Sequence, residues 1–209
     1  MRHTSFLRPA AAAHSGSTRE KPSSGPAAPW TVIVSATTPT TPDMNVLLQQ
    51  ARAEPFAPDG NYAYTKLTGG TIPPFVPPHR IEGRFGEVLE LQGFDIKGKL
   101  RGGETLHLQL YCQASAAAHR ELRIFVHLEA ADGRIIAQDD ALGYDAREWQ
   151  PGDRFIGVHD LKLPDDLPAA PSRLIVGLYD VVTGERYPVG GAQGRGDYIE
   201  IPLSTLNEA

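Results

Sequence analysis

The sequence has very few of the features that usually point to a membrane protein or a disulfide-stapled domain. Its single cysteine, Cys112, excludes an internal disulfide. No apolar run approaches the roughly 18 residues that a membrane-spanning helix requires. The longest candidate, residues 174–182, is interrupted by Gly177 and Asp180. We therefore expect a soluble chain with no membrane span and no disulfide framework.

The charge pattern also excludes a class of partner. The 209 residues include 25 acidic and 20 basic side chains, for a formal net charge of -5. Binding of a phosphate backbone needs clustered lysine and arginine, whereas the basic residues of this chain are scattered. We expect no nucleic-acid partner.

Signatures of catalysis are missing as well. The sequence has no GxSxG elbow, and Ser115 and Ser172 have no evident base partner. The glycine-rich stretch 190–196 neither opens a helix nor carries a Walker lysine, so it does not match a phosphate-binding loop. We expect a flexible hairpin loop there, no cofactor, and no enzymatic activity.

Two sets of candidate metal ligands are weak. His107 and His127 are expected to point outward from strands that could be neighbours, but a third ligand is lacking and zinc usually takes three or four. The pairs Asp139-Asp140 and Asp165-Asp166 are adjacent in sequence, and neighbouring residues of a strand point to opposite faces. We expect no metal site, exposed or hydrogen-bonded histidines, and carboxylates that solvate loop edges.

Residues 1–80 differ in composition from the rest of the chain. Twelve of the 18 prolines lie there, and apolar periodicity is nearly absent. With little to bury, this Pro/Ala/Ser-rich arm is predicted to be disordered or ordered only by a partner. Two islands stand out, a possible strand at residues 30–36 and a possible helix at 43–54. The first 19 residues contain three arginines and no acidic residue, which superficially matches an organelle transit peptide, but their composition favours a flexible basic tail. No secretory signal is visible.

The stretch 121–140 carries the clearest pattern. Apolar side chains alternate from Leu122 to Leu128, so they share one face of a strand. Asp132-Gly133 predicts a tight turn, and residues 135–137 return as the partner strand. We predict a central β-hairpin with one buried face.

Further alternating segments follow the same period of two. They are residues 87–97, 105–113, 155–163, 172–180, 185–189 and 198–203. In the first of these the phase slips at Gly93, which predicts a β-bulge. In the second, Cys112 falls on the inward face. About eight short strands separated by turn signals predict an all-β fold, a two-sheet antiparallel sandwich of immunoglobulin or fibronectin type over residues 85–206.

An ordered series of short motifs runs through these strands. It comprises Phe85-Gly86-Glu87, Leu91-Gln92-Gly93-Phe94, Gly103-Glu104-Thr105-Leu106, Leu110-Tyr111, Phe125-Val126-His127-Leu128, Asp132-Gly133-Arg134, Ala137-Gln138-Asp139-Asp140, Trp149-Gln150-Pro151-Gly152-Asp153, Gly177-Leu178-Tyr179-Asp180 and Thr183-Gly184-Glu185-Arg186. The series resembles the soluble C-terminal β-sandwich region of bacterial membrane glycosyltransferases of the dolichyl-phosphate-mannose protein mannosyltransferase type. The resemblance covers residues 85–206.

The sequence departs from that family in two respects. Cys112 stands where a large aromatic residue is expected after Tyr111. The multi-span membrane region that carries the transferase chemistry of the family has no counterpart here. The resemblance therefore implies an accessory sandwich without transferase activity, in an extracytoplasmic location.

Five residues form a candidate ligand site: Tyr111, Phe125, His127, Tyr144 and Trp149. If these side chains are exposed beside amides and carboxylates, they suit a pyranose, which has apolar C–H faces and a rim of hydroxyls. Exposed aromatics serve protein interfaces equally well. In the opposing interpretation, Phe125 and Tyr111 are covered by the arm or a second layer and Trp149 plugs one end of the sandwich.

Two functions follow as expectations. The first is a non-catalytic accessory module that binds carbohydrate or a glycan-bearing surface. The alternative is a structural subunit of a larger assembly, docked through its extended N-terminal arm, because such an arm can become ordered along a partner.

Overall fold

The computed structural model describes residues 4–9, 30–35, 52–56, 64–68, 75–141, 145–167, 171, 173–191 and 193–207. Nearly all of the described regular structure is β-strand. The strands are β1 (Thr4–Pro9), β2 (Trp30–Ser35), β3 (Arg52–Phe56), β4 (Tyr64–Thr68), β5 (His79–Phe85), β6 (Leu89–Lys97), β7 (Thr105–Ala114), β8 (Leu122–Glu129), β9 (Ile135–Ala141), β10 (Arg154–Lys162), β11 (Arg173–Asp180), β12 (Val189–Gly190) and β13 (Ile199–Ile201). Two short 3-10 helices, η1 (Ala146–Glu148) and η2 (Leu203–Asn207), accompany them.

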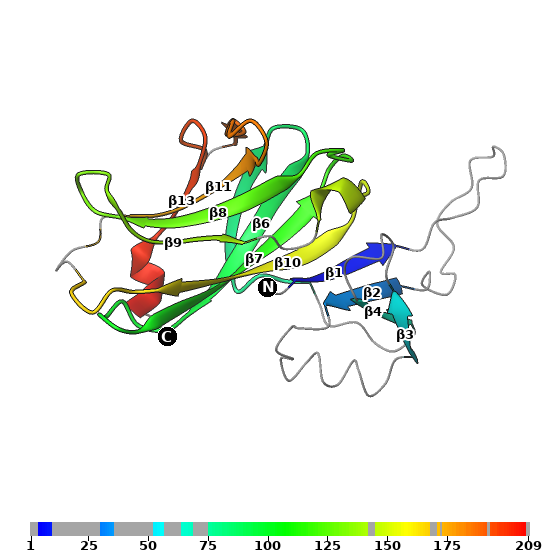
Figure 1. Cartoon of the computed structure of the whole chain (residues 1–209), viewed down its shortest axis with the longest axis horizontal. Helices are drawn as coiled ribbons and strands as arrows, with labels where there is room; N and C mark the ends of the chain where they lie inside the picture. The colour runs from blue at the N-terminus through cyan, green and yellow to red at the C-terminus, as the bar shows by residue number, and fades with distance from the viewer. Residues whose placement is uncertain are drawn as a thin grey trace.

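The strands form two antiparallel sheets. The larger sheet has the order β12-β5-β6-β7-β10-β1-β2-β4-β3, and the smaller sheet has the order β13-β11-β8-β9. The smaller sheet lies over the β5–β6–β7–β10 part of the larger one, while β1 to β4 extend beyond it (Figure 1). The predicted all-β, two-sheet sandwich is confirmed.

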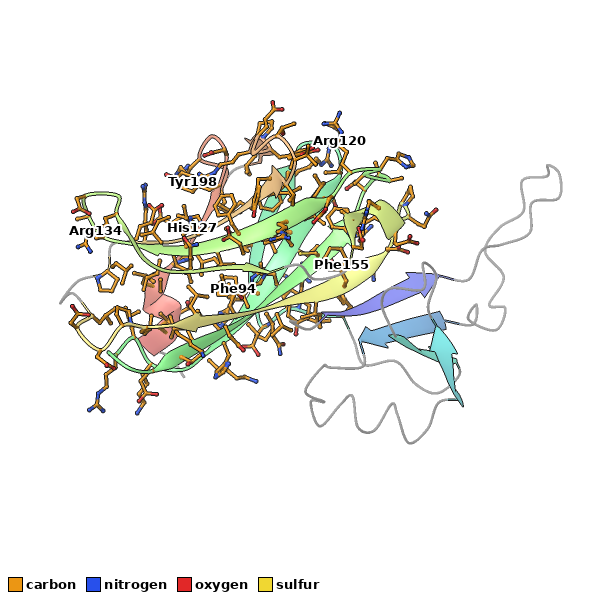
Figure 2. All side chains as sticks on the ribbon, viewed as in Figure 1. Phe94, Arg120, His127, Arg134, Phe155 and Tyr198 are labelled. Atoms are coloured by element: carbon orange, nitrogen blue, oxygen red, sulfur yellow. The ribbon has the colours of Figure 1, made fainter. Side chains whose placement is uncertain are left out.

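The core is the layer of alternating apolar side chains between the two sheets. On β7 every second residue from Leu106 to Ala114 is buried, and Cys112 is among them. Phe94 and Phe155 fill the same layer (Figure 2). Each fully buried leucine or phenylalanine contributes roughly 1.5–3 kcal/mol relative to an exposed one. Burial also raises the pKa of the Cys112 thiol, so the residue acts as a small apolar side chain, as predicted.

The central hairpin forms as predicted, with one correction. β8 pairs with β9, and Gly133 adopts a φ of 81°, which a glycine reaches without a Cβ clash. However, Phe125, His127 and Glu129 are buried on the outer face as well. The prediction of a single buried face is therefore wrong, because other side chains cover the smaller sheet from outside.

The phase slip at Gly93 is a β-bulge, as predicted. The register between β6 and β7 shifts between Leu91 and Gly93. The preceding strand β5 was not predicted, since Gly83 interrupts its apolar alternation. Ile81 and Phe85 nevertheless point into the core, and a Cβ on Gly83 would lie 2.3 Å from Ile199 Cδ1. The space is small because β5 packs closely against β13, and a side chain at position 83 would require Ile199 to move.

Asp139 ties the edge of the smaller sheet to β10. Its Oδ2 accepts a hydrogen bond of 3.0 Å from the backbone N–H of Asp160, and it lies 3.5 Å from Nδ1 of buried His159. The neighbouring Asp140 points to the opposite face of β9 and bonds His127 at 3.1 Å. The opposite orientation of the two carboxylates was predicted, but Asp139 is buried between the sheets and is not at a solvated loop edge.

The N-terminal third contributes strands to the larger sheet. β1 pairs with β10, and β2, β4 and β3 follow outward. The strand predicted at residues 30–36 is confirmed as β2. The helix predicted at 43–54 is wrong for residues 52–54, which belong to β3; its other residues lie outside the described ranges, as does most of the predicted arm. Among the described residues, no helix is long and apolar enough to cross a membrane.

Two short segments near the C-terminus differ in detail from the prediction. Residues 185–189 were expected to be a strand, and the structure has only the bridge between Tyr179 and Arg186 and the two-residue strand β12. The last strand ends at Ile201, and η2 follows. The glycines of the 190–196 stretch favour turns over extended pairing.

Candidate functional site

Two of the predicted ligand-binding residues lie on the outer face of the smaller sheet and are covered. Only 1% of Phe125 is exposed. Its ring occupies the space above Gly177, where a Cβ would lie 2.1 Å from Phe125 Cζ, and the guanidinium of Arg186 stacks 4.3 Å from the ring centroid. The prediction that Phe125 is exposed for ligand binding is therefore wrong, because Arg186 and the Asp197 loop cover it.

His127 is buried beside Phe125. The two ring centroids lie 4.7 Å apart, and Nε2 of His127 is 3.1 Å from Oδ1 of Asp140. Asp140 also bonds the Tyr179 hydroxyl; burial and this carboxylate raise the pKa of Tyr179. His127 therefore belongs to a buried polar cluster of the sheet, and the prediction that it points to a ligand is wrong.

Trp149 does not add to a shared site. Trp149 is 2% exposed and packs against Phe155, with ring centroids 5.3 Å apart. It fills one end of the sandwich, as the opposing interpretation held. Tyr144 lies outside the described residues. His107 lies on β7 with its Nδ1 2.8 Å from Asp160, whereas His127 is in the other sheet, so the two histidines are not neighbours.

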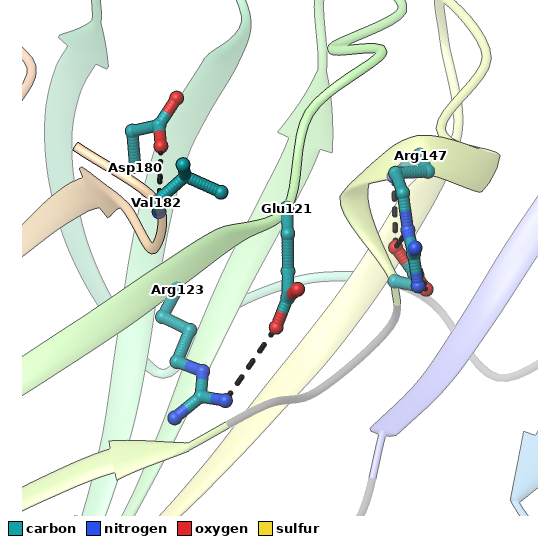
Figure 3. A network of polar contacts seen from close by, with 6 residues as sticks. Glu121, Arg123, Arg147, Asp180 and Val182 are labelled. Carbon is teal, nitrogen blue, oxygen red and sulfur yellow. Dashed lines mark hydrogen bonds and ion pairs between the residues drawn. The ribbon is translucent and has the colours of Figure 1, made fainter. Parts of the chain in front are cut away.

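Ion pairs and capping carboxylates secure the loops around the smaller sheet (Figure 3). Asp180 accepts backbone hydrogen bonds from Thr183 and Val182, and these bonds lower its pKa despite its burial. Burial raises the pKa of Asp145, but hydrogen bonds and the charge of Arg147 outweigh this effect, so the pKa of Asp145 is below its ordinary value. These carboxylates are structural, since each accepts hydrogen bonds from its own turn.

Tyr111 lies on the outer face of the larger sheet. It is half-buried, and its ring meets that of Phe75 edge-on, with centroids 5.2 Å apart. Phe75 precedes β5 and is also half-buried. An edge-to-face pair of this kind favours a fixed arrangement of the two rings. The aromatic pair Phe75–Tyr111 is thus a partly exposed apolar surface on the outer face of the larger sheet.

The segment of Phe75 to Pro77 crosses the sheet at the β6 bulge. A Cβ on Gly93 would lie 2.3 Å from the backbone oxygen of His79 and 2.5 Å from Cβ and Cγ of Pro77. Only a glycine lets the chain approach β6 this closely. The bulge therefore positions Phe75 against Tyr111.

Planar polar side chains surround the aromatic pair. Nε2 of Gln92 donates a 2.8 Å hydrogen bond to Oε1 of Gln113, and Nε of Arg154 donates to the same oxygen at 3.3 Å. The Arg154 guanidinium also lies 5.8 Å from the Phe75 ring centroid. These contacts hold two amides and a guanidinium beside the rings in defined positions.

A groove of about 1200 Å³ extends from Phe75 across β5 and β6 to the β12 loop. Its lining is mixed, and the polar members are Arg80, Glu82, Arg84, Glu87, Glu90, Gln92 and Gln193. Arg84 and Glu90 form an ion pair at 2.9 Å, and Gln193 accepts a 3.1 Å hydrogen bond from the Glu82 backbone. We call this space, together with Tyr111, Gln113 and Arg154 at its Phe75 end, the β5–β6 groove.

The groove offers donors, acceptors and an apolar ring surface. The two most buried His–Asp pairs, His127–Asp140 and His159–Asp139, are elsewhere: one is on the outer face of the smaller sheet and the other is between the sheets. Neither pair lines the groove. Within the described residues, no group of three or more potential metal ligands comes together. The arrangement is suited to holding a polar ligand through hydrogen bonds and ring contacts.

Comparison with known proteins adds no relative: no family model, no curated protein and no solved structure matches the chain.

Sequence reasoning found Tyr111 but missed its partners. Phe75 lies in the proline-rich arm that was predicted to be disordered or ordered only by a partner, and Arg154 begins a strand with no unusual pattern. A signal for strand β5 is present in the sequence, because polar residues alternate with Ile81, Gly83 and Phe85. The strand was missed because Gly83 has no apolar side chain to continue the pattern.

Proposed function

We propose that this protein is a non-catalytic β-sandwich module that binds carbohydrate in the β5–β6 groove. The observation that carries the proposal is the aromatic pair Phe75–Tyr111 beside two amides and a guanidinium on one sheet face. A pyranose has apolar C–H patches, which favour an aromatic ring, and hydroxyls, which favour planar side chains that donate and accept hydrogen bonds.

The resemblance to the accessory region of membrane glycosyltransferases supports the same proposal. A glycan-binding face is consistent with an accessory domain of enzymes that transfer sugars. Of the five residues predicted from the sequence, only Tyr111 belongs to the proposed site. Its other members include Phe75, Gln113 and Arg154. The proposal places the protein on an extracytoplasmic glycan surface and assigns no transferase activity to it.

Two measurements test the proposal: a screen for binding to immobilised glycans, and then isothermal titration calorimetry with the same glycans in solution. We expect Tyr111→Ala and Phe75→Ala to weaken binding at least tenfold, because each change removes one ring of the pair. Tyr111→Phe retains the ring and should bind within a few-fold of the unchanged protein. Val182→Ala is a control, since Val182 is 85% exposed and lies outside the groove. Absence of binding to every glycan at millimolar concentration would refute the proposal.

A structural role in a larger assembly is the second candidate. β3 ends the larger sheet and, among the described residues, pairs with β4 alone. A strand with an unpaired edge can accept another strand by β-augmentation. Sedimentation analysis of the purified chain, alone and in lysate, separates the two functions. A monomer in both samples would contradict the assembly role and leave glycan binding unaffected.

A further inference from the structure

We infer that the β5–β6 groove selects anionic glycans built from uronic acids, and that Arg154 receives the carboxylate of the sugar that lies against Phe75–Tyr111. This inference rests on the proposed function. It adds the class of ligand and a residue that determines specificity.

The first argument is the pairing of arginines in the described part of the chain. Arg84 is neutralised by Glu90, Arg147 by Asp145 and Arg173 by Glu129. A longer set of arginines is paired in the same way: Arg120, Arg123, Arg134 and Arg186. Arg154 is exposed, and no carboxylate in the described ranges forms an ion pair with it. The same holds within these ranges for Arg80, Arg101 and Arg195, but of these four arginines only Arg154 lies over the Phe75 ring. The charge of Arg154 is available to a ligand.

The second argument is that Arg154 is held in place. Its Nε bonds Gln113, and its guanidinium lies on the Phe75 ring. These two contacts leave the terminal N–H groups of the fork, Nη1 and Nη2, as donors toward a ligand. A guanidinium presents these donors in a planar fork that matches both oxygens of a carboxylate. Because the fork is already positioned, less side-chain entropy is lost on binding.

The third argument is the position of the competing charges. Glu82 lies on β5, three strand spacings from Arg154 on β10, or roughly 14 Å across the sheet. Glu90 is two strands away and is neutralised by Arg84. Glu87 follows β5 at the turn. The carboxylates of the groove therefore do not occupy the position that a ligand anion takes beside Phe75.

Recognition of a carboxylate can be separated from attraction to any anion by the choice of glycan. Polygalacturonate and its fully methyl-esterified form share a backbone and differ in the charge of the carboxyl group. We expect the full-length protein to bind the free acid at least tenfold more tightly than the ester, as measured by calorimetry at fixed salt. Dextran sulfate supplies an anionic glycan without carboxylates and should bind more weakly than polygalacturonate.

Arg154→Gln should abolish the preference for the acid and retain binding of the ester, because the rings remain. Arg154→Lys retains the charge without the fork and should restore only part of the preference. Arg101→Gln is the matched control, since it removes one exposed positive charge outside the groove. Thermal unfolding of each variant checks that the sandwich is intact.

Three results would overturn the inference. Equal binding of acid and ester by the unchanged protein refutes the selection of anions and leaves carbohydrate binding in place. Equal binding of dextran sulfate and polygalacturonate shows attraction to charge without carboxylate recognition. An unchanged preference in Arg154→Gln assigns the specificity to another residue. Absence of binding to the acid, the ester and neutral glycans alike would refute the proposed function as well.

Discussion

Gly93→Ala tests whether the bulge in β6 supports both the fold and the groove. The added Cβ would lie 2.3 Å from the His79 backbone oxygen and 2.5 Å from two atoms of the Pro77 ring. Neither neighbour is the end of a flexible side chain, so the segment of Phe75 to Pro77 must move. Forcing an extra methyl group into a packed site typically costs about 1–3 kcal/mol. We expect Gly93→Ala to lower the free energy of unfolding by about 2 kcal/mol.

Urea denaturation followed by circular dichroism measures this loss. With an m-value of about 2 kcal/mol/M, a loss of about 2 kcal/mol lowers the unfolding midpoint by roughly 1 M. The movement of Phe75 should also weaken glycan binding at 25 °C, where the variant is still folded. The two readouts connect the bulge to the site.

Gly190→Ala is the control for this variant. It makes the same chemical change in a strand of the same sheet, but a Cβ there meets no atom within 4 Å. A substitution of this kind is expected to change stability by no more than about 0.5 kcal/mol. If Gly93→Ala is as stable as Gly190→Ala, the close approach of Pro77 to β6 is not a constraint and the reasoning fails.

Three further predictions concern the two sheets and their loops. Asp139→Ala leaves the partly buried N–H of Asp160 without this acceptor and should cost about 1–3 kcal/mol in urea denaturation. Asp139→Asn keeps an oxygen acceptor, and an equal loss in both variants would contradict this account. Phe125→Ala should cost about 3–5 kcal/mol in the same assay, and a loss below 1 kcal/mol would show that the outer face repacks. The pKa of Asp145 is lower in the folded state, so its stabilising effect is complete above an unfolded-state pKa of about 3.9 and is lost as the pH falls below it. Thermal unfolding of Asp145→Asn should therefore show its largest deficit at neutral pH and a smaller one near pH 3; a deficit independent of pH would exclude the contribution of the Arg147 contact.

Some surface features could be predicted only in part from the sequence. Alternation shows that two faces of a strand differ, but it does not show what lies over each face. For β8 the prediction treated Phe125 and His127 as exposed, because they alternate with Leu122, Ile124 and Val126. Arg186 and the Asp197 loop come from residues about 60 to 70 positions later and cover that face. This contact depends on the tertiary fold.

The sequence by itself determined the sandwich. Apolar side chains occur at every second position, and Asp-Gly, Pro-Gly and Thr-Gly turns separate the strands. Such strands bury their apolar face by forming two sheets that pack against each other. It also placed Cys112 in the core and the bulge at Gly93, since both follow from local periodicity.

The tertiary structure alone decided which side chains reach solvent together. Phe75 and Tyr111 are 36 residues apart, and Arg154 is 43 residues further along the chain; the pairing of β6, β7 and β10 brings them to one face. Such contacts depend on strand order and on the close approach of Pro77 to Gly93. Neither leaves a periodic signal in the sequence, because each is set by packing between segments that are distant in the chain.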